Sequence, residues 1–312
     1  MVTGGAGFIG SHTVEALLRE GQSVLVVDNL YAGSQSNLPV GHNRLIMERI
    51  DISSQSSLWR GLRPLRECGD VRIIHLAAMV NVVEVRRRPD RAMRVNVLGT
   101  LNLLEAARRL DASRFVFSSS VAVYGEPQYL PIDENHPLNP KNLYGSSKLM
   151  GEMLVKQYYS DYSIPYAILR YFNVYGPRMR PGPYAGVVLR FIEALLGGSP
   201  PTIYGDGEQT RDFVYVGDVA RANLLALRAG RVGSFNIGSG RSVSVNQLLE
   251  TLCRLLNRGC PRPRRLPARP GDIRHSRASV EKARRELGWF PTTYLEKGLA
   301  LTVDYYLRKA MH

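Results

Sequence analysis

The chain has 312 residues, of which 44% are hydrophobic and 22% charged, which is the balance of a globular protein, and no stretch approaches the roughly 18 apolar residues that span a bilayer. Its three cysteines (Cys68, Cys253 and Cys260) form neither a disulfide framework nor a metal-ligand spacing, so we expect a reduced, cytoplasmic protein without a metal site. A formal charge of +14 suits either nucleic acid or an anionic small ligand, but basic residues are dense only at 261–270 and no nucleic-acid-binding signature accompanies them.

The first half of the sequence alternates short apolar runs with helical patterns. Strands are predicted at Met1–Thr3, Ser23–Asp28, Arg44–Glu48, Arg72–Leu76, Arg114–Ser118 and Tyr166–Tyr171. Helices are predicted at His12–Glu20, Ala92–Leu110 and Tyr144–Tyr159. Strands separated by helices indicate an α/β fold, a Rossmann-type doubly wound parallel sheet with right-handed crossovers.

After Pro177 the composition changes, with more Gly, Pro and Arg. Short strands (Phe213–Val216, Ser234–Ile237) alternate with helices at Val188–Leu196, Val219–Leu227, Val245–Leu256, Val280–Leu287 and Leu295–Leu307. We therefore expect a first domain over 1–177, which holds the doubly wound sheet, and a smaller, irregular α/β lobe over 178–312. Some segments of the second part are expected to return to the first domain, and Pro181, Gly182 and Pro183 suggest a lid at 178–186.

A glycine-rich loop, Thr3-Gly4-Gly5-Ala6-Gly7-Phe8-Ile9-Gly10, follows the first strand and opens the first helix. Its glycines let the pyrophosphate of a dinucleotide approach the backbone, and the helix N-terminus supplies free N–H groups. Asp28 ends the second strand, where a carboxylate can accept hydrogen bonds from ribose hydroxyls and repels a 2′-phosphate. The sequence thus predicts NAD rather than NADP, with Asp51 and Ile52 beside the adenine.

Tyr144 and Lys148 are four residues apart on a predicted helix, so they share one face. An ammonium beside the phenol would lower the phenol's pKa. A phenol tuned toward neutrality can act as general base on a hydroxyl. Alone such a pair is usually a solvated helix face, but a nucleotide loop in the same chain favours catalysis.

Several further motifs are typical of one enzyme family. They are Asp28-Asn29, His75-Leu76-Ala77-Ala78, Asn96-Val97-Leu98-Gly99-Thr100, Phe117 to Gly125, Arg170 to Arg178, Arg211-Asp212-Phe213 and Arg269-Pro270-Gly271-Asp272. With the glycine loop and the Tyr144–Lys148 pair, the chain resembles the extended short-chain dehydrogenase/reductase family nearly end to end. Within that family the resemblance is to the UDP-galactose (UDP-glucose) 4-epimerases.

This resemblance implies that a tightly held NAD oxidises C4 of a UDP-sugar and returns the hydride to the other face. Tyr144 would take the 4-hydroxyl proton, Lys148 would bind the nicotinamide ribose, and Ser120 would bridge the reacting oxygen. The implied cofactor-binding residues are Gly4, Gly7, Phe8, Ile9, Gly10, Asp28, Asn29, Asp51, Ile52, Leu76, Ala77, Ala78, Asn96, Ser118, Tyr144, Lys148 and Tyr171. A homodimer built on the helices at Ala92–Leu110 and Tyr144–Tyr159 is also implied.

The residues after Ser120 separate this chain from relatives of different activity. Sugar-nucleotide 4,6-dehydratases resemble one another in an Asp-Glu pair at this place, and UDP-glucuronate decarboxylases usually keep a glutamate. Here the positions hold Val121 and Ala122, which cannot transfer a proton. Simple epimerisation at C4 is favoured, and the alternative that stays open is a UDP-glucuronate 4-epimerase or another sugar-nucleotide enzyme of the same family.

At the substrate end, Arg211 and Arg269 match arginines that clamp the UDP diphosphate, since guanidinium groups suit phosphate oxygens. By the same resemblance Asp272 would hold the uridine ribose, and Asn173 would contact the diphosphate–sugar region. Ser276 matches a position that gates the sugar pocket, and its small size suggests that 2-acetamido sugars fit.

One position departs from the pattern of the epimerases. Val80 stands where some of them carry a lysine that contacts the cofactor pyrophosphate. Arg86–Arg88 could compensate, or NAD could be held less tightly.

Overall fold

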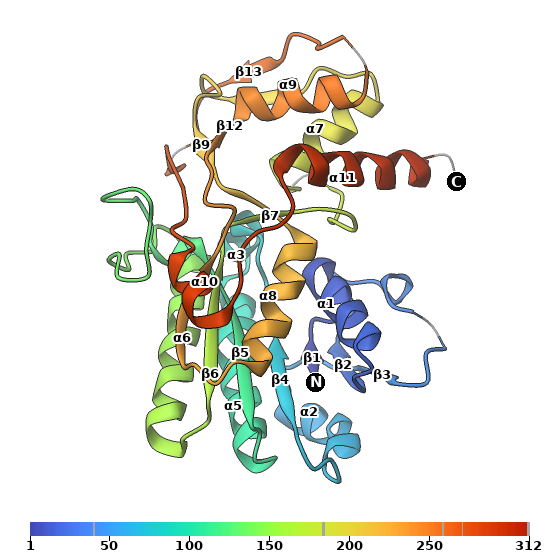
Figure 1. Cartoon of the computed structure of the whole chain (residues 1–312), viewed down its shortest axis with the longest axis vertical. Helices are drawn as coiled ribbons and strands as arrows, with labels where there is room; N and C mark the ends of the chain where they lie inside the picture. Colours follow the sequence, from blue (N-terminus) through green and yellow to red (C-terminus); the bar gives the residue numbers. More distant parts are fainter. Residues whose placement is uncertain (40, 183–184, 258, 270, 311–312) are drawn as a thin grey trace.

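The computed structural model describes residues 1–39, 41–182, 185–257, 259–269 and 271–310. At its centre lies a seven-stranded parallel sheet in the order β11-β6-β5-β4-β1-β2-β3 (Figure 1). Its strands are β1 (Val2–Thr3), β2 (Val24–Asp28), β3 (Leu45–Arg49), β4 (Arg72–His75), β5 (Arg114–Ser120), β6 (Tyr166–Tyr171) and β11 (Gly233–Ile237). The strand order reverses between β1 and β4, and such a switch point opens a crevice at the carboxyl ends of the strands.

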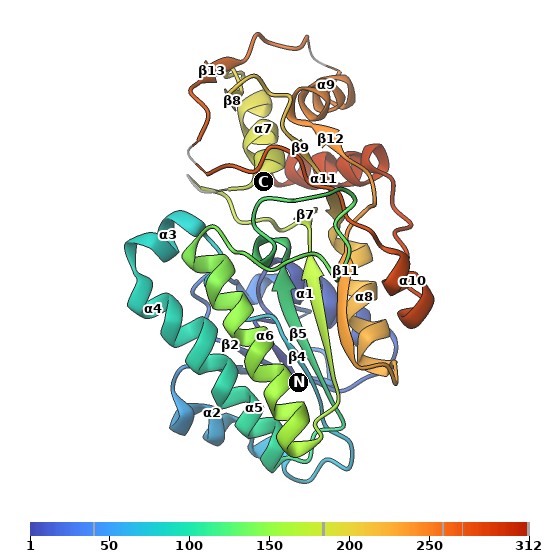
Figure 2. The same cartoon turned by 90° about the vertical axis from the view of Figure 1, so that its left-hand side faces the viewer.

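Helices cover both faces of this sheet (Figure 2). Helices α1 (Phe8–Arg19) and α8 (Val216–Arg228) pack on one face, and α2 (Gln55–Gly61), α5 (Gly99–Arg109) and α6 (Leu143–Tyr162) on the other. Strand β2 contributes to both layers. Val24 and Val26 belong to the core shared with α1 and α8, and Leu25 and Val27 to the core shared with α2, α5 and α6. A continuous apolar strand is what a sheet buried on both faces requires.

All the predicted strands and helices are present, with ends shifted by a few residues. The predicted helix at Ala92–Leu110 differs most, because it is divided into α4 (Pro89–Met93), a π-helical turn (Arg94–Leu98) and α5. The sequence pattern does not predict α2 or α3 (Val82–Arg87), both of which are short. In the described part of the chain, no helix is long and apolar enough to cross a membrane.

A second lobe lies above the carboxyl ends of the strands (Figure 1). Helices α7 (Val187–Leu196), α9 (Val245–Leu255) and α11 (Leu295–Ala310) share a core of their own. Three small two-stranded sheets join β10 (Phe213–Tyr215) to β7 (Asn173–Tyr175), β12 (Val243–Ser244) to β9 (Thr210–Arg211), and β13 (Arg264–Leu266) to β8 (Thr202–Tyr204).

The chain returns from the second lobe to the large sheet. Strand β11 pairs with β6, and α8 packs into the same core as α1. Residues 216–237 therefore lie with the first part of the chain, and the division at residue 177 stays a prediction. Of the expected lid, residues 183–184 lie outside the described residues; Pro270 of the Arg269–Asp272 motif does too.

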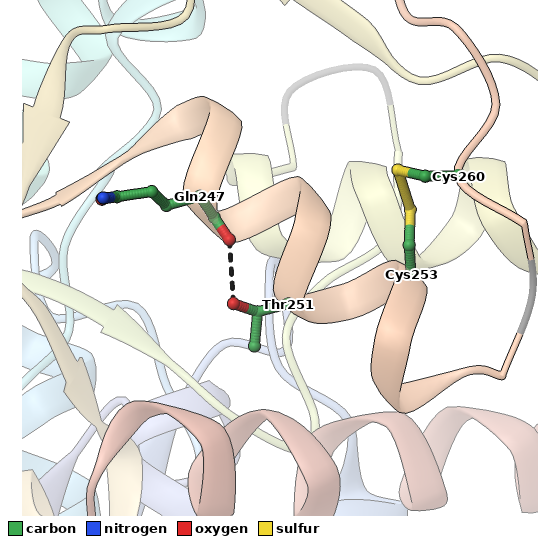
Figure 3. Close-up of a disulfide and its surroundings, with 4 residues drawn as sticks. All are labelled: Gln247, Thr251, Cys253 and Cys260. Atoms are coloured by element: carbon green, nitrogen blue, oxygen red, sulfur yellow. Dashed lines mark hydrogen bonds between the residues drawn. A yellow bond between two sulfur atoms is a disulfide. The ribbon is translucent and has the colours of Figure 1, made fainter.

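The prediction that the cysteines are all reduced is wrong for two of them. Cys253 and Cys260 form a disulfide (Figure 3), and their Cα atoms are 5.2 Å apart. Cys253 is buried near the end of α9, two residues after Thr251, whose hydroxyl donates to the carbonyl of Gln247. Composition cannot reveal that these two cysteines meet. The cytoplasmic assignment, which rested partly on these cysteines, stays a prediction.

Replacing Cys260 by Ser should lower the free energy of unfolding by about 2 kcal/mol, because the bond restricts a short loop in the unfolded chain. Urea denaturation of the oxidised protein would measure this change. The matched control is Cys68→Ser, since Cys68 is free and exposed. If both variants unfold at the same urea concentration as the parent, the disulfide does not contribute to stability.

Candidate active site

A cleft of about 700 Å³ opens at the carboxyl ends of the central strands. It is lined by sixteen of the residues that the resemblance assigns to the cofactor: Gly4, Gly7, Phe8, Ile9, Gly10, Asp28, Asn29, Asp51, Ile52, Leu76, Ala77, Ala78, Ser118, Tyr144, Lys148 and Tyr171. The remaining one, Asn96, is buried behind the wall. Its side chain bonds both backbone groups of Met79 and the Ser147 hydroxyl, so it supports the wall of the cleft from the π-helical turn.

The glycine loop brings the N-terminus of α1 to the floor of this cleft. Gly7 is the N-cap residue, and none of the side chains that the structure describes caps the first-turn N–H groups, which leaves them to a ligand. Gly4 has a φ of 68°, which residues with a side chain rarely adopt. A Cβ on Gly10 would collide with the carbonyl oxygen of Gly4 and lie 2.7 Å from the Cα of Gly5.

Gly10→Ala should therefore remove bound dinucleotide and lower the unfolding temperature, because helix and loop would be forced apart. The control is Gly69→Ala, since a Cβ at Gly69 meets nothing within 4 Å. Nicotinamide content per purified chain, measured beside thermal unfolding, checks the prediction. A Gly10→Ala protein with the parent's content would contradict it.

Three polar side chains border the cleft where β2 and β3 end. The Asp28 carboxylate accepts hydrogen bonds from the N–H groups of Ala6 (3.0 Å) and Leu30 (2.8 Å). The Asn29 amide donates to Asp51 at 3.1 Å. Burial raises the pKa of Asp28, and its two backbone hydrogen bonds oppose this. The carboxylate thus couples the glycine loop to the end of β2.

Tyr144 and Lys148 lie in the first two turns of α6, which Asn142 caps by accepting from the Gly145 N–H at 2.9 Å. The Lys148 ammonium is buried and donates to the Ser118 carbonyl, at the end of β5, at 2.8 Å. Ser120 ends β5 and accepts from the Ala122 N–H at 3.2 Å. The Ser120 hydroxyl lies near enough to the Tyr144 hydroxyl to lower the pKa of the phenol. The structure therefore brings the three predicted catalytic residues together.

The expectation of a lowered phenol pKa is wrong for this structure. Desolvation raises the pKa of Tyr144, and the neighbouring Ser120 hydroxyl opposes the rise only in part. Burial also lowers the pKa of Lys148 to about 7, while the charge of Glu152 acts in the opposite direction. The sequence placed the two groups on one face of the helix, but it could not show how far both are removed from water.

The sequence analysis missed a group of side chains around Tyr31 at the rim of the cleft. The Tyr31 hydroxyl donates to Glu84, and its ring lies 4.3 Å from the Arg91 guanidinium and 5.7 Å from that of Arg180. All four residues line the cleft. They come from separate loops and helices, so no spacing in the sequence signals their meeting.

Arginines also surround the position of the missing lysine. Val80 lines the cleft, as do Arg87 and Arg88, whereas Arg86 is not among the described lining residues. Arg178 lines it too and forms an ion pair with Glu15 at 2.5 Å. In the described part of the chain, the second terminal nitrogen of Arg178 is buried without a partner. The cleft thus has cationic groups suited to a diphosphate.

The predicted substrate residues lie in the second lobe and at its junction with the sheet; none is among the described residues that line the cleft. Arg211 and Asp272 form an ion pair at 2.5 Å. The Arg269 guanidinium lies 3.9 Å from the ring of Tyr204, another residue that the sequence analysis missed. The Asn173 amide donates to the Asp212 carbonyl at 3.2 Å. Ser276 is buried, and its hydroxyl has no partner in the described part of the chain.

Comparison with known proteins agrees with this arrangement. The model of the GDP-mannose 4,6 dehydratase family matches residues 1–302. The UDP-glucose 4-epimerase of Mycolicibacterium smegmatis is 38% identical over 313 residues, which cover 99% of each chain. The UDP-glucuronic acid decarboxylase 5 of Arabidopsis thaliana is 34% identical over 321 residues, covering 100% of this chain and 90% of that protein.

Two solved structures extend the comparison. The UDP-glucose 4-epimerase of Thermotoga maritima, crystallised with UDP-glucose, has a TM-score of 0.94 and 41% identity, covering 100% of this chain and 99% of that chain. The Thermus thermophilus UDP-glucose 4-epimerase, in complex with NAD, has a TM-score of 0.90 and 39% identity over 98% of both chains. This chain therefore belongs to the GDP-mannose 4,6 dehydratase family of extended short-chain dehydrogenases/reductases, and it is similar over its whole length to UDP-glucose 4-epimerases.

Proposed function

We propose that this protein is an NAD-dependent 4-epimerase of UDP-hexoses that interconverts UDP-galactose and UDP-glucose. The observation that carries the proposal is the meeting of Tyr144, Lys148 and Ser120 beside a cleft floored by the glycine loop. The similarity to epimerases crystallised with UDP-glucose and with NAD supports both the substrate and the cofactor.

The cleft residues fit NAD. The uncapped N–H groups of α1 and the Arg178 guanidinium suit its pyrophosphate. The Asp28 carboxylate, which accepts from the Ala6 N–H here, would also accept hydrogen bonds from the adenosine ribose hydroxyls. When bound, NAD would supply the hydride acceptor and donor for C4 of the sugar. The arginines that line the cleft would take the place of the lysine that Val80 replaces.

Each catalytic side chain has one task in this mechanism. Tyr144 removes the proton of the 4-hydroxyl and later returns it, and Ser120 holds the same oxygen by a hydrogen bond. Lys148, charged and anchored at the end of β5, stabilises the phenolate. The 4-keto sugar then rotates within the site, and its C4 accepts the hydride on the opposite face.

The substrate end is proposed from the second lobe. Arg211 and Arg269 would clamp the UDP diphosphate, Asp272 the uridine ribose, and Asn173 the sugar-proximal phosphate. The Arg211–Asp272 ion pair would have to rearrange when a diphosphate binds. Ser276 is small at a position where a bulky aromatic would exclude an acetamido group, so we propose UDP-N-acetylglucosamine and UDP-N-acetylgalactosamine as further substrates. Rates on both sugar pairs test this, and no turnover of the acetamido pair would refute it.

The experiment that tests the function is incubation of purified protein with UDP-galactose and no added cofactor. UDP-glucose should form, because the NAD is resident. Absence of product even with added NAD would overturn the proposal. The same assay with UDP-glucuronate tests the alternative, because a UDP-glucuronate 4-epimerase would convert that substrate and not UDP-galactose. Decarboxylation is disfavoured because Val121 and Ala122 lack a group that transfers a proton.

We also propose a homodimer through α5 and α6, the helices on the outer face in Figure 2. Met150 and Met153 on α6 and Leu98 before α5 are exposed by 45%, 64% and 43%. Exposed apolar side chains on neighbouring helices are typical of an interface. Light scattering should give twice the mass of one chain, and Met153→Lys should shift it toward the monomer.

A further inference from the structure

A buried ion pair lies directly behind the proposed catalytic residues. Arg170 on β6 binds Glu152 on α6 through two hydrogen bonds, of 2.9 Å to Oε1 and 2.7 Å to Oε2. The two side chains are 2% and 0% exposed. Replacing such a pair by apolar groups is often neutral or stabilising, so burial of charge here points to a role other than stability.

Glu152 connects this pair to the catalytic residues along one helix face. Tyr144, Lys148 and Glu152 follow one another at intervals of four residues, so their side chains lie in one row. Glu152 also accepts a hydrogen bond of 2.5 Å from the hydroxyl of Ser119. Ser119 lies between Ser118, whose carbonyl binds Lys148, and Ser120. The Glu152 carboxylate thus holds the end of β5, where Ser118 binds Lys148 and Ser120 lies beside Tyr144.

Arg170 is itself fixed from the other side. Its guanidinium donates to the Tyr124 hydroxyl at 2.9 Å, and that hydroxyl donates to Asn236 on β11 at 2.7 Å. Tyr124 and Asn236 are fully buried. The network therefore ties β5, β6, β11 and α6 together and holds the Glu152 carboxylate by contacts from both β5 and β6.

Few other charges face Lys148. From β4, His75 is buried between the hydroxyls of Thr3 and Thr100, and burial together with the charge of Lys148 lowers its pKa. Tyr144 on α6 and Tyr171 on β6 are phenols whose pKa burial raises. Glu152 is thus the carboxylate that acts on the ammonium.

We propose that Glu152, held by Arg170, is a positioning residue that keeps Lys148 in its charged form and fixes the Ser118–Ser120 strand end for catalysis. This inference rests on the proposed epimerase function for its kinetic consequence, though not for its electrostatic one. The negative charge of Glu152 stabilises the ammonium, and the ammonium in turn stabilises the Tyr144 phenolate.

The test is the double variant Glu152→Gln/Arg170→Met, which removes both charges together, so that neither charge is left buried without the other. The control is Glu20→Gln/Arg228→Met, which removes an exposed ion pair at the far end of α1 and α8. We expect about a tenfold fall in kcat, equivalent to one pKa unit at Lys148. The alkaline limb of the pH profile of kcat should also move to lower pH. Bound nicotinamide and unfolding temperature should stay near those of the parent.

A second measurement does not depend on turnover. The chain has six lysines, so NMR titration of isotope-labelled lysine, assigned with Lys148→Met, follows the Lys148 ammonium directly. Its pKa should fall in the double variant and not in the control. An unchanged Lys148 titration would overturn the inference, as would a pH profile that superimposes on the parent's. If the parent itself turns over no UDP-sugar, the proposed function fails while the titration still decides the role of Glu152.

Discussion

Tyr144→Phe should reduce epimerase turnover by about 10²- to 10⁴-fold, the range that a positioned general acid–base contributes. The substitution removes one oxygen and leaves the ring, which packs against the cluster of Met79, Val85 and Ala92. The wall of the cleft should therefore stay intact. Bound nicotinamide should equal that of the parent, and the loss should appear in kcat rather than in substrate binding.

The control for this variant is Tyr159→Phe, because Tyr159 lies on the same helix but is exposed away from the cleft. It should keep the parent's turnover. Rates on UDP-galactose and nicotinamide content would be measured for all three proteins. If Tyr144→Phe keeps a turnover within a factor of about three of the parent, another group is the base and the mechanism is wrong.

The features that could be predicted from the sequence are local ones. The glycine loop and the start of α1 are adjacent in sequence, and the Tyr144–Lys148 pair needs only one helix, so spacing defines them. The strands of the sheet are apolar runs that burial on both faces requires. Their parallel order follows from the alternation with helices, which is why β1 to β6 were predicted closely.

The features that could not be predicted depend on chain segments that meet only in the folded protein. Tyr31, Arg91 and Arg180 come from three separate segments. The Glu152–Arg170 pair joins α6 to β6, and the disulfide joins Cys253 to Cys260. The pKa of Tyr144 likewise depends on how much water the surrounding elements exclude, and periodicity contains no such information.

Lys148→Met should lower turnover at neutral pH by roughly 10- to 10³-fold, because a neighbouring ammonium lowers the pKa of a phenol by about 1 to 3 units. The loss should shrink as pH rises above about 7, because Lys148 of the parent then loses its own charge. Lys156→Met is the control, because Lys156 is exposed on the same helix. Profiles of kcat against pH between 6 and about 10 would separate the two outcomes. A loss that is equal at every pH would mean that Lys148 acts by holding the cofactor alone.

The same variant should change how stability depends on pH. Burial lowers the pKa of Lys148 from 10.5 to about 7, so between these values the folded protein binds fewer protons than the unfolded chain. The free energy of unfolding therefore gains a contribution that rises with pH from about 7 to 10.5 and is absent below that window. Lys148→Met abolishes this contribution, and Lys156→Met retains it. Urea denaturation of cofactor-free protein at pH 7, 8 and 9 would measure the slope. If the free energy of unfolding has the same slope against pH in the parent and in Lys148→Met, the ammonium is as well solvated in the folded protein as in the unfolded chain. The electrostatic coupling from Glu152 through Lys148 to Tyr144 would then lose its physical basis.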